Sequence, residues 1–154
     1  MRTVKLTLKP YLAEYLQKRY PGSEPGVVKL PPSSHLYYLV LASLRSRPAG
    51  VEEEGNVELM LPNPSPYSGK RRPSRINYLA PYAKDRIASV VYASYWEDCH
   101  RHMERRIHVH GDTIIGAASS FISEHGLTLS NEDAILKNYQ RWRRRFHAPK
   151  ERKT

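Results

Sequence analysis

Apolar residues in the first part of the chain recur at two different spacings. Residues 3–8 and 57–61 place them at every second position, and residues 27–30 form a short apolar run, so these three segments are predicted to be strands. Residues 11–19 and 35–45 place them every three or four positions, which predicts two helices, the second apolar on most sides. The N-terminal part is therefore expected to be a small β-α-β-α-β body.

In the second half of the chain, the periodic segments are all helical. The longest pattern covers residues 77–106, and another covers residues 113–125, where Gly126 is expected to end the helix. Asp112 precedes this helix, and its carboxylate is expected to cap the first turn. A further helix is predicted over residues 132–146. Together the segments predict an α+β fold that is predominantly helical and ends in a helix-turn-helix-like pair.

Prolines, glycines and charges divide the chain into four segments. Residues 1–62 form the N-terminal α+β part, residues 63–76 a basic loop rich in proline and glycine, residues 77–147 the helical part, and residues 148–154 a basic tail. A chain of 154 residues is long enough to bury a core without a disulfide or a metal. We expect one compact domain overall.

The helix predicted over residues 132–146 has two chemically different sides. Large apolar residues recur on one side at steps of four, three and four: Ile135, Tyr139, Trp142 and Phe146. Basic residues lie on the opposite side: Lys137, Arg141 and Arg144, with Arg145 beside them. A helix that packs by its apolar side and exposes a basic side is suited to binding a polyanion. The alternative is that the arginines only keep an exposed side of the helix soluble.

The net charge of +10 is concentrated in blocks. Residues 70–75 hold four basic side chains and no acidic one: Lys70, Arg71, Arg72 and Arg75. Residues 131–154 hold eight basic and three acidic side chains, whereas residues 76–130 are nearly neutral. Basic patches of this kind favour nucleic acid or another polyanion as the partner.

Residues 112–147 resemble the helix-turn-helix units of DNA-binding proteins. The bend over residues 126–130 is longer than the usual turn, and Glu132 and Asp133 occupy the end of the second helix that normally meets base edges. The later part of the helix is therefore expected to make the contacts. The residues expected there are Lys137, Arg141, Arg144 and Arg145 at phosphates, and Asn138 or Gln140 at base edges.

The N-terminal sequence KLTLKPYLAEYLQKRY, in a small basic chain, is similar to that of accessory proteins of phages and mobile elements to which DNA binding is assigned. This resemblance implies a DNA-binding regulatory role. It brings no catalytic residue, cofactor or ligand with it.

Residues 98–112 contain many side chains of metal-binding type: Asp98, Cys99, His100, His102, Glu104, His108, His110 and Asp112. Their spacing matches no zinc signature, and a single cysteine excludes most structural zinc classes. The chain also lacks the glycine-rich nucleotide-binding motifs and the nucleophile motif G-x-S-x-G. We therefore expect no metal, no cofactor and no enzymatic activity.

The function we expect is non-enzymatic binding of nucleic acid, duplex DNA before RNA, through the basic loop and the C-terminal helix. Two alternatives stay open. One is a protein-interaction module, whose aromatic helices pair two copies of the chain or bind a partner and whose basic residues meet an acidic protein. The other is an RNA-binding module. The single cysteine, and the lack of a signal peptide or of an apolar run of membrane-spanning length, suit a cytoplasmic protein.

Overall fold

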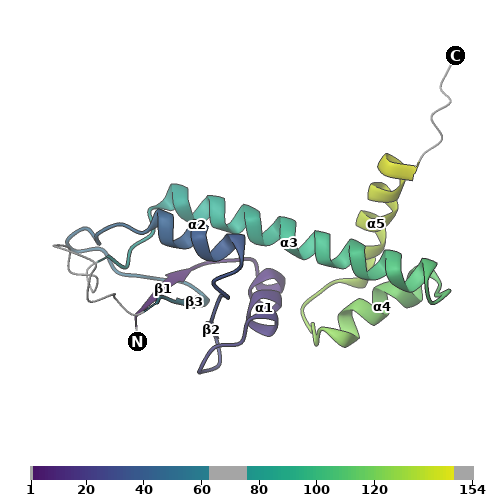
Figure 1. The fold of residues 1–154 in the computed structure, drawn as a ribbon, viewed down its shortest axis with the longest axis horizontal. Helices are drawn as coiled ribbons and strands as arrows, with labels where there is room; N and C mark the ends of the chain where they lie inside the picture. Colours follow the sequence, from purple (N-terminus) through teal and green to yellow (C-terminus); the bar gives the residue numbers. More distant parts are fainter. Residues whose placement is uncertain (1, 63–75, 148–154) are drawn as a thin grey trace, which may run out of the picture. The chain divides into compact units, whose positions relative to one another are not determined.

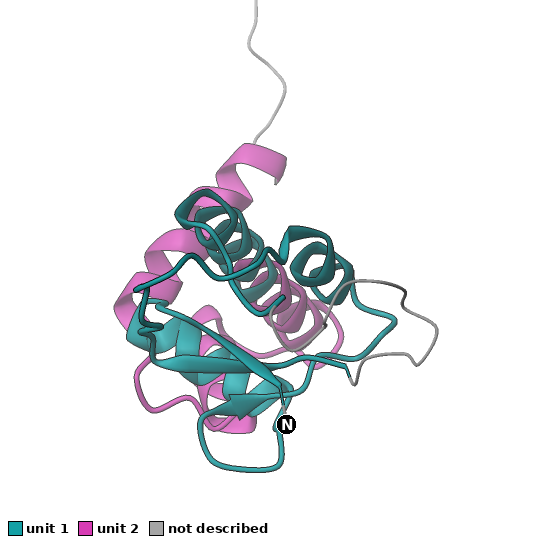
Figure 2. Ribbon diagram, turned by 90° about the vertical axis from the view of Figure 1, so that its left-hand side faces the viewer, with its two compact units in different colours: residues 1–95 teal, residues 96–154 magenta. Residues whose placement is uncertain are grey.

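The computed structural model describes residues 2–62 and 76–147. Contacts divide the chain into two compact units, unit 1 (residues 1–95) and unit 2 (residues 96–154), which Figure 2 colours teal and magenta. All strands of the described residues lie in unit 1, whereas unit 2 is built of helices (Figure 1). The predicted α+β class with a helical C-terminal half is confirmed, with five helices and one three-stranded sheet in the described ranges.

A three-stranded sheet forms the base of unit 1. Its strands β1 (Thr3–Leu6), β2 (Val27–Val28) and β3 (Val57–Met60) lie in the order β1-β3-β2, so β3 is central. β3 pairs antiparallel with β1 and parallel with β2. Alternate residues of β1 and β3 are fully buried, as the period-two pattern predicts.

Each strand is shorter than its apolar pattern, and for β1 the reason is a side chain. The backbone N–H of Leu8 donates to Asn56 Oδ1 at 2.9 Å, and the Leu8 carbonyl accepts from Asn56 Nδ2 at 2.8 Å. The amide group of Asn56 thus makes the two hydrogen bonds that a neighbouring strand would supply. The alternation of residues 3–8 therefore extends the buried side of β1 beyond its last paired residue.

Helices α1 (Pro10–Arg19) and α2 (His35–Ser43) complete unit 1 together with the first part of α3 (Pro81–His108). Tyr15 of α1 is buried and packs edge-on against Tyr95 of α3, with ring centroids 5.3 Å apart.

α3 is 28 residues long, but charged side chains recur along it. None of the described helices combines the length and the apolarity needed to cross a membrane.

Less of α2 is buried than its apolar sequence predicts. Leu36 and Val40 are buried, whereas Tyr38 is 61 % exposed. The apolar side chains of α2 on its other sides are at most half-buried. A short helix at the surface buries one stripe, whatever the composition of its remaining positions.

Unit 2 contains the C-terminal part of α3 together with α4 (Ile114–Glu124) and α5 (Glu132–His147). α4 ends where predicted, because Gly126 adopts a φ of 63°, a left-handed conformation that glycine accepts without strain. Asn131 directly precedes α5, and its Oδ1 accepts the backbone N–H of Ala134 at 3.1 Å.

The predicted cap of α4 is wrong by one residue. Thr113, not Asp112, is the N-cap, and its Oγ1 accepts the backbone N–H of Gly116 at 3.0 Å. The Asp112 carboxylate instead accepts the Nε–H of Arg106 at 2.7 Å. Asp112 is thus used in a charge-assisted hydrogen bond to a guanidinium group, and the hydroxyl of the next residue caps the helix.

Candidate nucleic-acid interface

Two buried side chains fix how α5 is rotated about its axis in unit 2. Ile135 and Tyr139 are 1 % and 0 % exposed, and they lie four residues apart on one side of the helix. The Tyr139 hydroxyl donates to Glu104 Oε2 of α3 at 2.5 Å. Burial and this contact with a carboxylate raise the pKa of Tyr139, so the hydroxyl keeps its proton as a donor. The opposite side of α5 is therefore left in solvent.

His100 makes a second contact between α3 and α5. Its Nε2 lies 2.6 Å from Asn138 Oδ1, and its ring stacks on Trp142 with centroids 4.5 Å apart and planes inclined by 26°. Burial lowers the pKa of His100 below its ordinary value, even though the Asn138 contact acts in the opposite direction. The neutral ring donates from Nε2, because an amide oxygen can only accept. Asn138 is thereby engaged within unit 2 rather than presented to a base edge.

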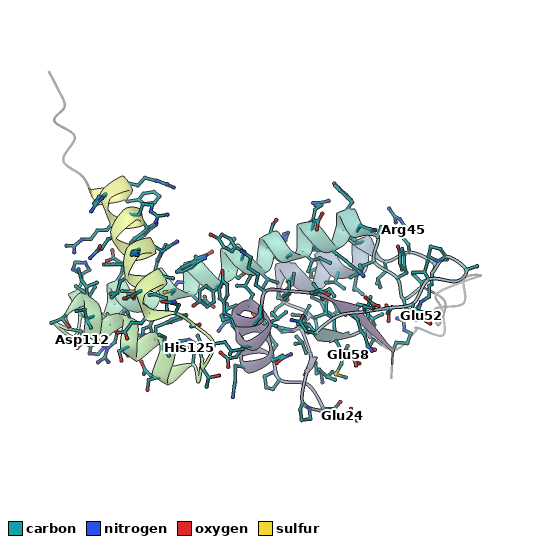
Figure 3. All side chains as sticks on the ribbon, turned by 180° about the vertical axis from the view of Figure 1, so that it is seen from behind. Glu24, Arg45, Glu52, Glu58, Asp112 and His125 are labelled. Atoms are coloured by element: carbon teal, nitrogen blue, oxygen red, sulfur yellow. The ribbon has the colours of Figure 1, made fainter. Side chains whose placement is uncertain are left out.

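Basic side chains cover the side of α5 that faces solvent. A helix turns by about 100° per residue, so Lys137, Arg141 and Arg144 fall within about 60° of one another, and Arg145 borders them. All four side chains and that of Gln140 are exposed, and nitrogen-tipped side chains project from α5 in Figure 3. Among the described residues, no carboxylate forms a salt bridge with any of these four cations. We call these four residues the basic face of α5.

Two arginines of α3 are arranged differently. Arg101 contacts Glu97 at 2.6 Å within the same helix. Arg106 contacts Asp112 at 2.7 Å. Carboxylates of the protein itself thus compensate these two guanidinium groups, whereas α5 contains no acidic residue after Asp133. The positive charge of the basic face is therefore open to an anion from outside.

The residues predicted to contact nucleic acid have different environments. Of those on α5, five are exposed, and Asn138 is half-buried against His100. The predicted cluster in the loop lies outside the described residues: Lys70, Arg71, Arg72 and Arg75. Arg143, which the predicted set omits, is half-buried, and its charge acts on the Tyr139 hydroxyl. The side chains that orient the helix, Glu104 and His100, carry no signal of that role in the sequence.

One cluster of unit 2 combines a hydroxyl, an imidazole and a carboxylate. Ser120 Oγ donates to Glu124 Oε2 at 2.6 Å, and His102 Nε2 lies 3.0 Å from both oxygens. In a catalytic triad, the carboxylate orients the histidine through the nitrogen opposite the nucleophile. Here one nitrogen faces both groups, and the serine proton is directed at the carboxylate, so this arrangement does not activate the hydroxyl. Burial lowers the pKa of His102 more than the exposed Glu124 raises it.

Several residues of the segment 98–112 whose types could bind a metal are instead buried or contact other side chains of the protein. Cys99 is fully buried, and burial together with the charge of Asp98 raises the pKa of its thiol to about 12. The reactive thiolate is therefore hardly populated near neutral pH. No three His, Cys, Asp or Glu side chains gather into a possible metal site within residues 2–62 and 76–147.

Comparisons with known proteins give no relative. No protein-family model matches the chain, and neither a curated protein nor a solved structure is significantly similar to it.

Tyr139→Phe should lower the free energy of unfolding of unit 2 by about 1.5–3 kcal/mol, because it removes a donor from the half-buried Glu104 carboxylate. The two tryptophans of the chain, Trp96 and Trp142, both lie in unit 2. Urea unfolding followed by tryptophan fluorescence therefore reports on this unit.

A double-mutant cycle with Glu104→Gln separates this hydrogen bond from general packing effects. The combined variant Tyr139→Phe/Glu104→Gln should lose clearly less free energy of unfolding than the sum of the two single variants. The reason is that each single change already breaks or weakens the same contact. Strictly additive losses would show that Tyr139 and Glu104 stabilise the unit independently, against the arrangement described above.

Acidification should destabilise unit 2. Burial lowers the pKa values of His100 and His102 in the folded protein, whereas in the unfolded chain they return to about 6.5. The unfolded state therefore binds these protons more readily than the folded state. The contribution of the two neutral histidines to the free energy of unfolding is complete above about pH 6.5 and is lost as the pH falls below it. Tryptophan-monitored unfolding at about pH 7.5 and about pH 5 measures the loss.

The control is the variant His100→Gln/His102→Gln, which cannot take up these two protons. It should be less stable at neutral pH, because it loses the stack on Trp142 and the contact with Glu124. The dependence of its stability on pH should nevertheless be flatter. The prediction is contradicted if the free energy of unfolding of the unmodified protein rises toward pH 5. It is also contradicted if the free energy of unfolding changes with pH equally in both proteins.

Proposed function

We propose that this protein binds nucleic acid without catalysing a reaction and that duplex DNA is its main target. The observation that carries the proposal is the exposed basic face of α5: Lys137, Arg141, Arg144 and Arg145. No carboxylate of the described residues compensates these charges, and burial of Ile135 and Tyr139 on the other side of the helix keeps them outward. A rigid element that holds four cations in water is suited to a row of phosphates.

The binding free energy would come mainly from phosphate neutralisation. A phosphate that meets an arginine or a lysine releases a condensed counterion, and this release favours binding at low salt. The planar guanidinium group can bind two phosphate oxygens at once, so the arginines of the basic face would also orient the protein on the backbone. Gln140 is exposed next to this face and is the side chain available to a base edge.

The shape of α5 favours duplex DNA over duplex RNA. α5 is a 16-residue helix, and the major groove of B-form DNA, about 12 Å wide, admits a helix. The major groove of A-form RNA is deep and narrow. Glu132 and Asp133 are exposed at the start of α5 and would repel phosphates, so the later turns of the helix are the part that docks.

Other parts of the proposal rest on the sequence. The cluster at residues 70–75 is included as a further phosphate contact on the basis of its charge. The relation to accessory proteins of phages and mobile elements rests on the N-terminal sequence, and the cytoplasmic location on the single cysteine. Pairing of two copies and binding of RNA are the alternatives that the experiments below separate.

Removal of positive charge from the basic face should abolish or weaken binding to a short duplex. Arg141→Glu/Arg144→Glu/Arg145→Glu should abolish binding at moderate salt and leave the unfolding of unit 2 unchanged, because all three side chains are exposed. The neutral variant Arg141→Gln/Arg144→Gln/Arg145→Gln should still bind at low salt. Its slope of log affinity against log salt should be smaller by about three, measured by fluorescence anisotropy of labelled DNA.

The matched control reverses three exposed lysines of unit 1: Lys9, Lys18 and Lys29. Lys9→Glu/Lys18→Glu/Lys29→Glu changes the net charge by the same amount, yet it should retain most of the affinity. Equal losses in the two reversed variants would show that overall charge, not α5, governs binding. Tighter binding of structured RNA than of duplex DNA would favour the RNA alternative, and dimers in sedimentation that do not bind DNA would favour the interaction module.

A further inference from the structure

The aromatic side of α5 continues beyond the core of unit 2. Ile135 and Tyr139 are buried and Trp142 is half-buried, whereas Phe146 is 64 % exposed. The ring centroids of Trp142 and Phe146 lie 5.4 Å apart, with the planes inclined by 49°. At this end, α5 extends beyond the other helices of unit 2 (Figure 1). The large apolar ring of Phe146 is thus exposed to water, next to the half-buried ring of Trp142.

The charges around Phe146 are all positive along the helix. Arg143, three residues before Phe146, is its neighbour on the helix surface and is half-buried. Arg145 is exposed and lies about 100° around the helix from Phe146, whereas Arg144 lies on the opposite side. No acidic residue follows Asp133 in α5. An aromatic ring beside guanidinium groups is the combination that binds single-stranded nucleic acid, because the ring stacks on a base while the cations neutralise the phosphates.

We propose that Phe146 is a stacking platform for an unpaired nucleobase, so that the protein also binds single-stranded or frayed ends of nucleic acid. This inference rests on the proposed function, since Arg145 of the basic face, together with the half-buried Arg143, would hold phosphates of the strand whose base covers the ring. A base inside a duplex is already stacked on its neighbours and cannot cover the ring. An unpaired base offers a free π face along the whole strand, whereas a duplex offers one only at each terminal base pair.

Two other occupants fit Phe146 less well. A second copy of the chain would bring its own arginines against Arg143 and Arg145, and like charges at short range repel. An anionic membrane would accept the charges, but an interfacial helix buries a continuous apolar face. In the described part of α5, Phe146 is the exposed large apolar side chain, because Ile135 and Tyr139 are buried in unit 2.

The test compares Phe146→Leu with Phe146→Trp. Leucine keeps an apolar side chain and favours the helix, but it lacks a planar ring; tryptophan enlarges the ring. Affinities are measured by fluorescence anisotropy with a labelled oligothymidylate of about 20 nucleotides and with a duplex of about the same length. Phe146→Leu should weaken binding of the oligothymidylate roughly tenfold and of the duplex less than about twofold, whereas Phe146→Trp should retain or strengthen both.

Ile115→Ala and Leu129→Ala are the controls, because these side chains of unit 2 are also exposed, at 63 % and 56 %. Neither change should alter binding of the oligothymidylate or of the duplex. An unchanged affinity of Phe146→Leu for the oligothymidylate would overturn the inference, and so would an equal loss for single-stranded and duplex DNA. If Phe146→Leu lost only the binding of phosphatidylserine vesicles, Phe146 would be assigned to a membrane. If Phe146→Leu without DNA sedimented more slowly than the unmodified protein, Phe146 would be assigned to contact with a second copy.

These results are distinct from a failure of the proposed function. If Arg141→Glu/Arg144→Glu/Arg145→Glu still binds both forms of DNA, the basic face is not the binding site and the inference fails with it. If that variant loses both forms while Phe146→Leu behaves as the unmodified protein does, the basic face stands and only the stacking platform is overturned.

Discussion

The burial of Tyr139, whose hydroxyl reaches the half-buried Glu104, decides together with Ile135 which side of α5 faces water. A helix of this length has little stability by itself, so its orientation comes from the packing of its apolar side. With Ile135 and Tyr139 fully buried, the residues on the opposite side remain in solvent. A rotation of α5 by one residue, about 100°, would move charged side chains toward the core, where an unpaired charge costs several kcal/mol. The hydrogen bond to a carboxylate and the His100 stack restrict the same rotation.

Unit 2 uses its arginines in two ways. Arg101 and Arg106 are held by carboxylates of α3 and of the segment that follows it, and these pairs are satisfied within the unit. The arginines of the basic face have no such partner among the described residues, although the same chain supplies acidic residues elsewhere. Since surface ion pairs contribute little to stability, leaving these charges unpaired costs the fold little and leaves a cationic surface for a ligand. The same packing holds the His100 ring against Trp142, where burial lowers the pKa of His100.

Local features of this structure could be predicted from the sequence, and features that join distant segments could not. The two sides of α5 follow from helical periodicity, and the end of α4 follows from the conformational freedom of Gly126. The partners that orient α5 are 35 and 38 residues away along the chain, so no spacing rule identifies them. For the same reason, the sequence predicted Asn138 or Gln140 as a base contact without distinguishing them, whereas the structure engages the Asn138 oxygen with His100.

Arginine side-chain resonances would test most directly whether the basic face binds DNA. In nuclear magnetic resonance spectra, the Nε–Hε signals of Arg141 and Arg144 should shift when a short duplex is added, because their guanidinium groups are exposed and without a carboxylate partner among the described residues. The signals of Arg101 and Arg106 should stay in place, because carboxylates of the protein already bind them. A complex in which the α5 signals are unmoved, or in which only the paired arginines of α3 respond, would contradict the account.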